Sequence, residues 1–347
     1  MRDAPLNPAF LQACRGETPA HTPVWLMRQA GRYMAEYRAL RAKHSILEMI
    51  KDPEKATTVT LQPVNAFPVD AAIIFADILT LLEPMGLNLE FISGKGPVFH
   101  NPIRDPADIR ALKAIDAGRE LNFTLDAIRL SREKLANRIP LIGFSGAPYT
   151  LACYAIEGAG SKDFDNVRAW MFAHPQAWAD LMDRLTDAVT DYLLAQIHAG
   201  AQAVQLFDSW AGSLSLADYR RFAAPWSRRI FDTLAREAPD VPRIHFSANG
   251  GHLLEEISTF PISVLGLDWR VDAAAAVSKY GNTLAYQGNL DPARLLASDE
   301  AVREGVAAVK AAFSGAQAHI FNLGHGVVKT TPPERVKLLI DQVHARD

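Results

Sequence analysis

The sequence has few cysteines and no long apolar run. Only Cys14 and Cys153 occur in 347 residues, so the chain cannot form a disulfide framework, and a reducing compartment is expected. The first ten residues lack the pattern of a signal or transit peptide, and no uncharged apolar stretch reaches the roughly 18 residues of a membrane helix. These absences predict a cytoplasmic protein.

The chain also lacks a strong excess of charge of either sign. It has 36 Lys and Arg residues against 39 Asp and Glu residues, and this net charge of −3 gives no bulk attraction to nucleic acid or to a membrane. Neither Gly158–Lys162 nor Ser93–Gly96 has the spacing of a phosphate-binding loop. The ten histidines form no H-x-x-x-H or H-x-C pair, so the sequence indicates no metal site. Any site that binds an anion must therefore be local.

Hydrophobic residues make up 49% of the chain, and they recur in eight short runs that predict buried strands. The runs are VWLM (24–27), AAIIF (71–75), PLIGF (140–144), AVQLF (203–207), RIHF (243–246), SVLGL (263–267), TLAYQ (283–287) and HIFNL (319–323). Helix-like stretches separate them, and residues 181–197 place apolar side chains at steps of three and four. Eight such alternations predict a single-domain (β/α)8 TIM barrel over residues 1–347, with a doubly wound sheet as the alternative.

Shorter patterns add local detail to this barrel. Residues 87–100 contain a Gly-Lys-Gly turn and predict a small hairpin insertion. Asp291 before Pro292 predicts a helix start, and residues 331–334 have the spacing of a capping box.

Polar residues follow several of the predicted strands. They are Arg28–Arg32, Asp77, Asp208-Ser209 and Gly324–Gly326. Because the chemistry of a barrel lies on the loops after its strands, we expect these groups to converge at one mouth.

Positive charge is concentrated next to the first strand. Residues 28–43 contain four arginines, Lys43 and a single acidic residue, which is a local excess of four positive charges. Arginine-rich helices are usually solvated faces, and this is the interpretation for Arg38, Arg41 and Lys43. For Arg28 and Arg32, which flank small residues, binding of an anion is equally open.

The other polar candidates each have two interpretations. Asp77 fits either a helix N-cap or a functional anion that the arginines hold ionised. Tyr154 fits either a core residue or a site residue. Ser209 and His325 are weak candidates individually, and no G-x-S-x-G motif supports a serine nucleophile.

Five segments together resemble the uroporphyrinogen decarboxylase family. They are PVWLMRQAGRYMAEYRALR (23–41), DAAIIFADIL (70–79), GAPYTLACYAIEG (146–158), FDSWAG (207–212) and FNLGHGVVKTTPPERVK (321–337). The resemblance implies a single-domain (β/α)8 barrel and a homodimer. It also implies decarboxylation of the four acetate side chains of uroporphyrinogen III, giving coproporphyrinogen III and CO2, without cofactor or metal. One departure is Ala35, where the family usually has proline.

The same resemblance assigns roles to individual residues. Asp77 is the expected catalytic residue, which binds pyrrole N–H groups and stabilises a cationic transition state. The substrate-binding residues implied are Arg28, Gln29, Ala30, Gly31, Arg32, Asp77, Tyr154, Ser209 and His325, with Arg41, Ile73 and Phe207 as secondary contacts. The proton donor stays open between an arginine, His325, Tyr154 and water.

Two rival functions are less well supported by the sequence. Cobalamin-dependent methyltransferases share the barrel, but they bind zinc through an H-x-C pair and a later cysteine that this sequence lacks. A non-catalytic tetrapyrrole carrier would use the same basic cleft, and it is disfavoured because Asp77 and both arginines are present.

Overall fold

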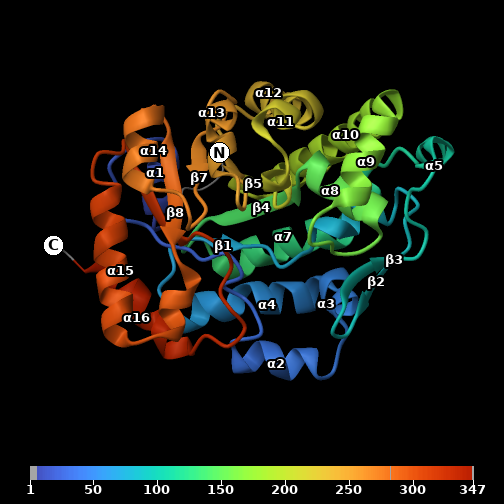
Figure 1. Ribbon diagram of the computed structural model, residues 1–347. Coiled ribbons are helices and arrows are strands. Elements are labelled where there is room, and N and C mark those ends of the chain that lie inside the picture. Colours follow the sequence, from blue (N-terminus) through green and yellow to red (C-terminus); the bar gives the residue numbers. More distant parts are fainter. Residues whose placement is uncertain (1–5, 282, 346–347) are drawn as a thin grey trace.

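A parallel sheet forms the centre of the computed structural model, which describes residues 6–281 and 283–345 (Figure 1). Its strands, in spatial order, are β1 (Ala72–Ile73), β4 (Leu141–Gly146), β5 (Ala203–Phe207), β6 (Arg243–Phe246), β7 (Val264–Gly266), β8 (Ala285–Leu290) and β9 (His319–Leu323). Each strand pairs in parallel with the next, for example Ala72 with Leu141 and Tyr286 with His319. These strands match seven of the eight predicted runs, and the curled parallel sheet confirms the α/β barrel class.

The eighth predicted run, residues 24–27, lies between the two edges of this sheet. Val24 forms an isolated parallel bridge with Phe321 of β9. On its other side, the Asp70 N–H donates to the Val24 carbonyl at 2.8 Å, just before β1. The segment therefore closes the barrel, although the structure shows a single bridge where the sequence predicts a regular strand.

Side-chain amides replace the missing ladder bonds of this closing segment. The Met27 N–H donates to Asn322 Oδ1 at 3.0 Å, and the Leu26 N–H donates to Gln29 Oε1 at 3.1 Å. The Gln29 Nε2 atom in turn donates to the Ala71 carbonyl at 3.1 Å. Because these bonds depend on two particular side chains, a run of apolar residues alone could not reveal them.

Helices surround the sheet. They are α1 (Ala9–Cys14), α2 (Ala35–Arg41), α3 (Ile46–Lys51), α4 (Pro53–Ala66), α5 (Pro106–Ala111), α6 (Ala117–Glu120), α7 (Asn122–Leu135), α8 (Pro148–Glu157), α9 (Asp165–Ala173), α10 (Pro175–Ala199), α11 (Leu216–Phe222), α12 (Ala224–Glu237), α13 (Leu254–Ile257), α14 (Ala273–Tyr280), α15 (Asp299–Ala312) and α16 (Pro333–His344). Short 3-10 helices are η1 (Ile78–Leu82), η2 (Ala211–Ser213), η3 (Gly251–Leu253) and η4 (Pro292–Leu296). The helix α10 contains the predicted helix 181–197 and buries the predicted face, including Leu181, Leu185 and Val189.

The core has two layers. Inside the barrel, Trp25, Ile142, Ile244 and Ile320 pack together, and α1 contributes Phe10 to the same cluster. A larger cluster fills the space between the sheet and the surrounding helices. The barrel interior is thus packed with side chains, which leaves the strand ends as the place for a site.

The predicted helix starts are only partly correct. Asp291 caps η4, a 3-10 helix, by accepting from the Ala293 N–H at 2.9 Å, and α15 begins only at Asp299. The capping box at residues 331–334 is wrong, because α16 begins at Pro333 after Pro332. The Thr331 hydroxyl is buried and has no hydrogen-bond partner there.

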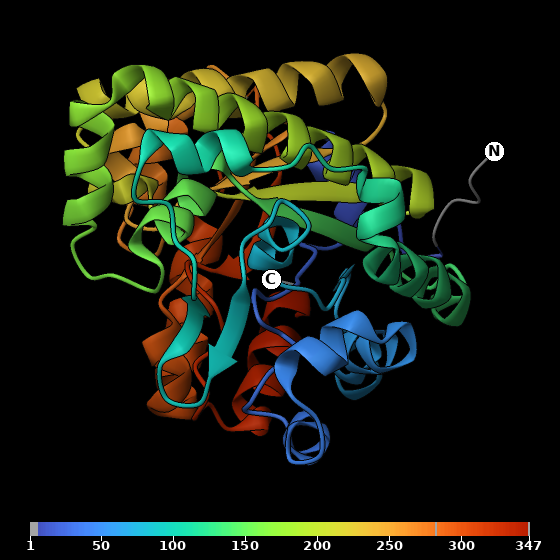
Figure 2. The same ribbon diagram turned by 90° about the vertical axis from the view of Figure 1, so that its right-hand side faces the viewer.

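The predicted hairpin is confirmed. Strands β2 (Leu89–Ile92) and β3 (Gly96–Phe99) pair antiparallel, and Figure 2 shows them as a separate projection outside the main sheet. Gly94 and Gly96 have φ angles of 81° and 88°, which explains the glycines on both sides of Lys95. In the described ranges, no helix is both long and apolar enough to cross a membrane.

The amino-terminal end of the barrel is held by Asp70, which is 1% exposed. Its carboxylate accepts from Asn7 Nδ2 at 2.6 Å and from the Val24 N–H at 2.7 Å. Histidine Nε2 atoms of His21 and His344 lie 2.7 and 2.8 Å from its two oxygens. The network connects the region before the first strand to the last helix, at the end of the barrel opposite the strand carboxyl ends.

Candidate functional site

The predicted site residues come from loops at the carboxyl ends of the strands. Arg28 follows the closing segment, Asp77 follows β1, Tyr154 lies on α8 after β4, Ser209 follows β5, and His325 follows β9. Their charges interact, since Arg28 lowers the pKa values of both Asp77 and His325. The Asp77 carboxylate in turn raises the pKa of Tyr154, after the larger effect of burial. Arg28, Asp77, Tyr154 and His325 therefore lie near one another, and Ser209 follows β5, the strand next to β4.

Arg28 has an unusual backbone conformation and a close neighbour. Its φ angle is 61°, a left-handed conformation that non-glycine residues adopt uncommonly. A Cβ atom added to Gly326 would lie 2.4 Å from Cδ of Arg28, so a larger residue at this position would displace the arginine side chain from the loop after β9. Arg28 is exposed, and no ion pair engages it among the described residues.

The other residues of the segment 28–32 differ in burial: one is buried and supports the loop, and the others reach the surface. Gln29 is 1% exposed, and its amide hydrogen-bonds to the backbone of Leu26 and Ala71. It therefore stabilises the closing segment of the barrel. Ala30 and Gly31 are partly exposed, and Arg32 is exposed.

The neighbouring cations were interpreted as a solvated face, and the structure refines this. Arg38 donates to the carbonyls of Arg32 and Tyr33 at 2.9 and 2.8 Å and so holds the loop. Arg41 donates to the His44 carbonyl, and Lys43 is exposed. Arg38 and Arg41 therefore stabilise the backbone near α2 through hydrogen bonds to carbonyl groups.

Asp77 combines both interpretations offered by the sequence. Its Oδ1 atom accepts from the Leu79 N–H at 2.9 Å and caps η1, while in the described chain Oδ2 has no hydrogen-bond partner. Burial raises the pKa of Asp77 to about 6, against the opposing effects of the Leu79 N–H and Arg28. Burial is therefore the largest influence on the pKa of this carboxyl, and the charge of Arg28 opposes it by favouring the ionised form.

This pKa sets an expected pH dependence. If the ionised Asp77 is the active form, kcat/KM should fall about tenfold per pH unit below about pH 6, because protonation removes the negative charge. A pH profile between 5 and 8 measures this, and Asp77→Glu should move the inflection. A flat profile across pH 6 would contradict a role for this carboxylate.

Tyr154 and Ser209 present hydroxyl groups at the same mouth. Tyr154 is partly buried, its ring lies 6.0 Å from that of Trp210, and burial raises its pKa to about 12. It is therefore a hydrogen-bond donor at neutral pH. Ser209 is partly buried, and within the described residues its hydroxyl has no hydrogen-bond partner. The Ser209 hydroxyl is available to a ligand, and the Tyr154 hydroxyl, which interacts with the Trp210 side chain, can still donate its own hydrogen.

The surroundings of His325 favour the neutral form of its imidazole. Burial lowers its pKa, and the charges of Arg28 and Arg270 lower it further, while Asp268 opposes them. A neutral imidazole has one donor and one acceptor nitrogen, so it can hydrogen-bond to a carboxylate or relay a proton.

Two features of the mouth were not predicted from the sequence, and the first is the structural role of Asp208, which was expected only as one of the polar residues that follow a strand. Asp208 is fully buried, accepts from Thr150 Oγ1 at 2.9 Å, and has its pKa raised to about 7 by burial. The Thr150 hydroxyl also accepts from the Trp210 N–H at 3.2 Å, so this carboxyl supports the loop that carries Ser209.

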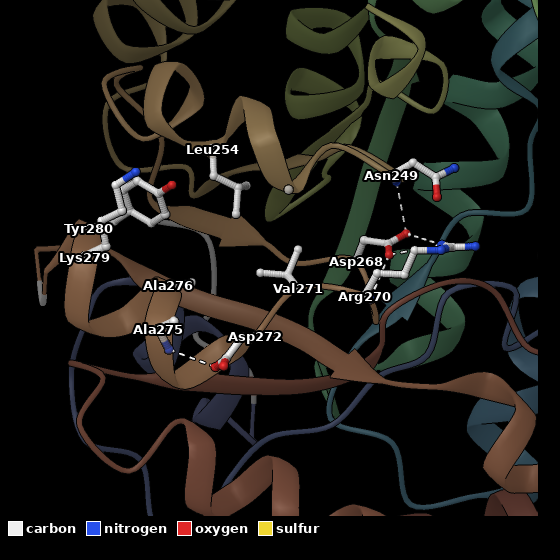
Figure 3. Close-up of a pocket in the computed structure, with 11 residues that line it drawn as sticks. Asn249, Leu254, Asp268, Arg270, Val271, Asp272, Ala275, Ala276, Lys279 and Tyr280 are labelled. Carbon is white, nitrogen blue, oxygen red and sulfur yellow. Dashed lines mark hydrogen bonds and ion pairs between the residues drawn. The ribbon is translucent and has the colours of Figure 1, made fainter. Parts of the chain in front are cut away.

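The second missed feature is Asp268–Arg270, directly after the predicted strand 263–267. A cavity of about 380 Å³ adjoins it, and Figure 3 shows Asp268 and Arg270 at one end and Lys279 at the other. Inspecting the residue after every strand, the rule already applied to the other loops, would have found it.

One group of side chains has the spacing of metal ligands among the residues described. It is His21, Asp70 and His344, whose ligand atoms lie within 4.8 Å of one another. This group belongs to the amino-terminal end of the barrel, away from the mouth.

The fold and the mouth define a class: an α/β-barrel protein whose strand ends hold arginines and a histidine around a partly buried carboxylate. A model of the family described as uroporphyrinogen decarboxylase (URO-D) matches residues 5–346, and the chain belongs to this family. It is 49% identical over 338 residues to the uroporphyrinogen decarboxylase of Chloroflexus aurantiacus, covering 97% of this chain and 95% of the relative. It is 48% identical over 339 residues to that of Carboxydothermus hydrogenoformans, covering 98% and 96%.

Solved structures agree on the fold. A methyltransferase from Methanosarcina mazei superposes with a TM-score of 0.80 over 98% of both chains, at 18% identity. A B12-independent methionine synthase from Shewanella sp. W3-18-1 has a TM-score of 0.54 at 11% identity, covering 86% of this chain and 88% of that one. At these identities the similarity concerns the barrel alone.

Proposed function

We propose that this protein decarboxylates the four acetate side chains of uroporphyrinogen III, giving coproporphyrinogen III and CO2 in porphyrin and haem biosynthesis. The observation that carries the proposal is the partly buried Asp77, with one oxygen free, beside Arg28 at the mouth of a URO-D family barrel. The same family membership supports a single domain over residues 1–347, a homodimer and a cytoplasmic location as parts of the proposal.

The charges of the mouth suit this substrate. Uroporphyrinogen carries eight carboxylates and four pyrrole N–H groups. Exposed Arg28 and Arg32 provide guanidinium groups for carboxylates, which they can bind through two parallel hydrogen bonds. Asp77 provides an acceptor for the N–H groups, and Tyr154 and Ser209 provide neutral hydroxyls. We assign Gln29 to supporting the loop rather than to contacting substrate, because its amide is already used.

In the proposed reaction the substrate supplies its own electron sink. Protonation of a pyrrole carbon makes the ring cationic, and the electron pair of the breaking C–CO2 bond moves into that ring. The exocyclic carbon then accepts a proton and becomes a methyl group, and the ring loses the proton it first gained. The Asp77 carboxylate stabilises the cationic ring, because a fixed negative charge in a partly desolvated site acts most strongly on charge that develops there.

Anaerobic incubation of the purified protein with uroporphyrinogen III tests the function. Products separated by carboxyl number should pass from eight carboxylates through intermediates to four. Binding without any loss of carboxylates would favour the carrier alternative and would contradict the proposal.

Activity should survive chelation and dialysis. The mechanism uses only this chain's side chains and the substrate, so treatment with EDTA should leave the rate of carboxylate loss unchanged. Rates before and after treatment, with and without added zinc, measure this. Loss of activity that zinc restores would overturn the metal-free mechanism.

A further inference from the structure

The loop after β7 places a tryptophan and an arginine at the mouth. Asp268 is 1% exposed, and its carboxylate accepts from the backbone N–H groups of Asn249 and Arg270 at 3.1 and 2.9 Å. The Nη1 atom of Arg270 lies 3.1 Å from each Asp268 oxygen. The buried carboxylate therefore orients this arginine from below.

The remainder of the Arg270 side chain is fixed by packing, while two of its guanidinium nitrogens have no hydrogen-bond partner in the described part of the chain. Its guanidinium lies over the Trp269 ring, with Cζ 4.1 Å from the ring centroid, and the side chain is 50% exposed. In the part of the chain that the structure describes, its Nε and Nη2 atoms make no hydrogen bond. A guanidinium that is fixed at one nitrogen and free at its other edge loses little conformational entropy when it binds a carboxylate.

Packing connects this arginine to the site already described. A Cβ atom added to Gly324 would lie 2.0 Å from the backbone nitrogen of Trp269, and the Trp269 N–H donates to the Gly324 carbonyl at 3.4 Å. Two residues further on, Gly326 packs against Arg28. His325 therefore lies in the chain between Gly324 and Gly326, which pack against Trp269 and Arg28. Burial lowers the pKa of His325, and the charges of Arg28 and Arg270 lower it further.

A cavity adjoins the loop that carries Arg270. It has a volume of about 380 Å³, and Leu254, Val271 and Ala276 contribute apolar side chains to its lining. Figure 3 shows the Arg270 guanidinium directed away from these side chains, toward the side of Asn249. The exposed guanidinium edge is therefore available outside this cavity.

We propose that Arg270 binds one carboxylate-bearing side chain of the substrate, while Arg28 binds another. Each pyrrole of uroporphyrinogen carries an acetate and a propionate on neighbouring carbons. Arg28 and Arg270, whose loops both pack against the segment 324–326, can each bind one of them, which would select substrates with adjacent carboxylates. This inference rests on the proposed decarboxylation.

The test is Arg270→Gln with uroporphyrinogen III as substrate. Removal of a half-exposed charged contact should raise KM about fivefold to tenfold and change kcat less than twofold, because the contact forms equally in the ground state and the transition state. Arg270→Lys should give an intermediate KM, since a lysine keeps the charge but loses the planar edge. The matched control is Arg303→Gln, an exposed arginine on α15, which is not one of the residues that line the cavity beside Arg270.

The outcomes separate this inference from the function itself. Thermal melts should show that each variant is folded, and raising the salt concentration should reduce the difference in KM between wild type and Arg270→Gln. If Arg270→Gln does not fold, the KM of Arg270→Lys decides the question. An unchanged KM in the folded variants, or an equal rise in Arg303→Gln, would overturn the role of Arg270. Absence of carboxylate loss by the wild type would instead overturn the proposed function.

Discussion

Asp77→Asn is expected to lower the decarboxylation rate about a hundredfold to a thousandfold while the protein stays folded. Asparagine caps a helix about as well as aspartate, so the bond from the Leu79 N–H to Oδ1 can be kept. The amide cannot stabilise a cationic pyrrole, and loss of one preorganised electrostatic contact costs about this much in other enzymes. Steady-state rates and thermal melts on the same preparation measure the two effects separately.

The chain contains a matched control for this substitution. Asp291 also caps a five-residue 3-10 helix, accepting from the N–H two residues later at the same 2.9 Å as Asp77. Asp291→Asn should therefore leave both melting temperature and rate nearly unchanged. Asp77→Glu keeps the charge but moves it by about one methylene, and an intermediate rate is expected. A stable Asp77→Asn variant with a wild-type rate would contradict the catalytic role of Asp77 and leave it only the role of capping η1.

Arg32→Ala should lower kcat/KM about tenfold to a hundredfold. A charge-assisted bond to a carboxylate contributes roughly 1.5–3 kcal/mol, and the described structure shows no protein partner that already uses this guanidinium. The carbonyl of Arg32 that accepts from Arg38 is unaffected by the substitution, so the loop should keep its conformation.

Lys43→Ala provides the comparison within the same positively charged segment. Lys43 is exposed just after α2, and its removal changes the local charge by the same amount. Its kcat/KM should stay within about twofold of wild type, since exposed charges act weakly at a distance. Similar losses in both variants would mean that the segment acts through its overall charge and not through a direct contact of Arg32.

Much of this fold could be predicted from local sequence. Seven apolar runs form strands because buried parallel strands need continuous apolar residues, and α10 follows its period of three and four. The hairpin was predictable from a local signal too, because its turn needs positive φ angles and the sequence has glycines at Gly94 and Gly96. The helix starts were less predictable, because Pro332 moved the start of α16 beyond Thr331.

The sequence by itself determined that polar residues such as Asp77, Ser209 and His325 follow apolar strands, and the direction of the strands in a barrel places such residues at one end. The tertiary structure alone decided what those residues can do there. Burial, which no motif encodes, sets the pKa of Asp77 near 6 and outweighs Arg28. A hydrogen bond to the Ala71 carbonyl, 42 residues away in the chain, uses the Gln29 amide to close the barrel. Arg28 and Trp269 both pack against the loop after β9, at Gly326 and Gly324. These effects depend on distances between segments far apart in the sequence, and such distances arise only when the chain folds.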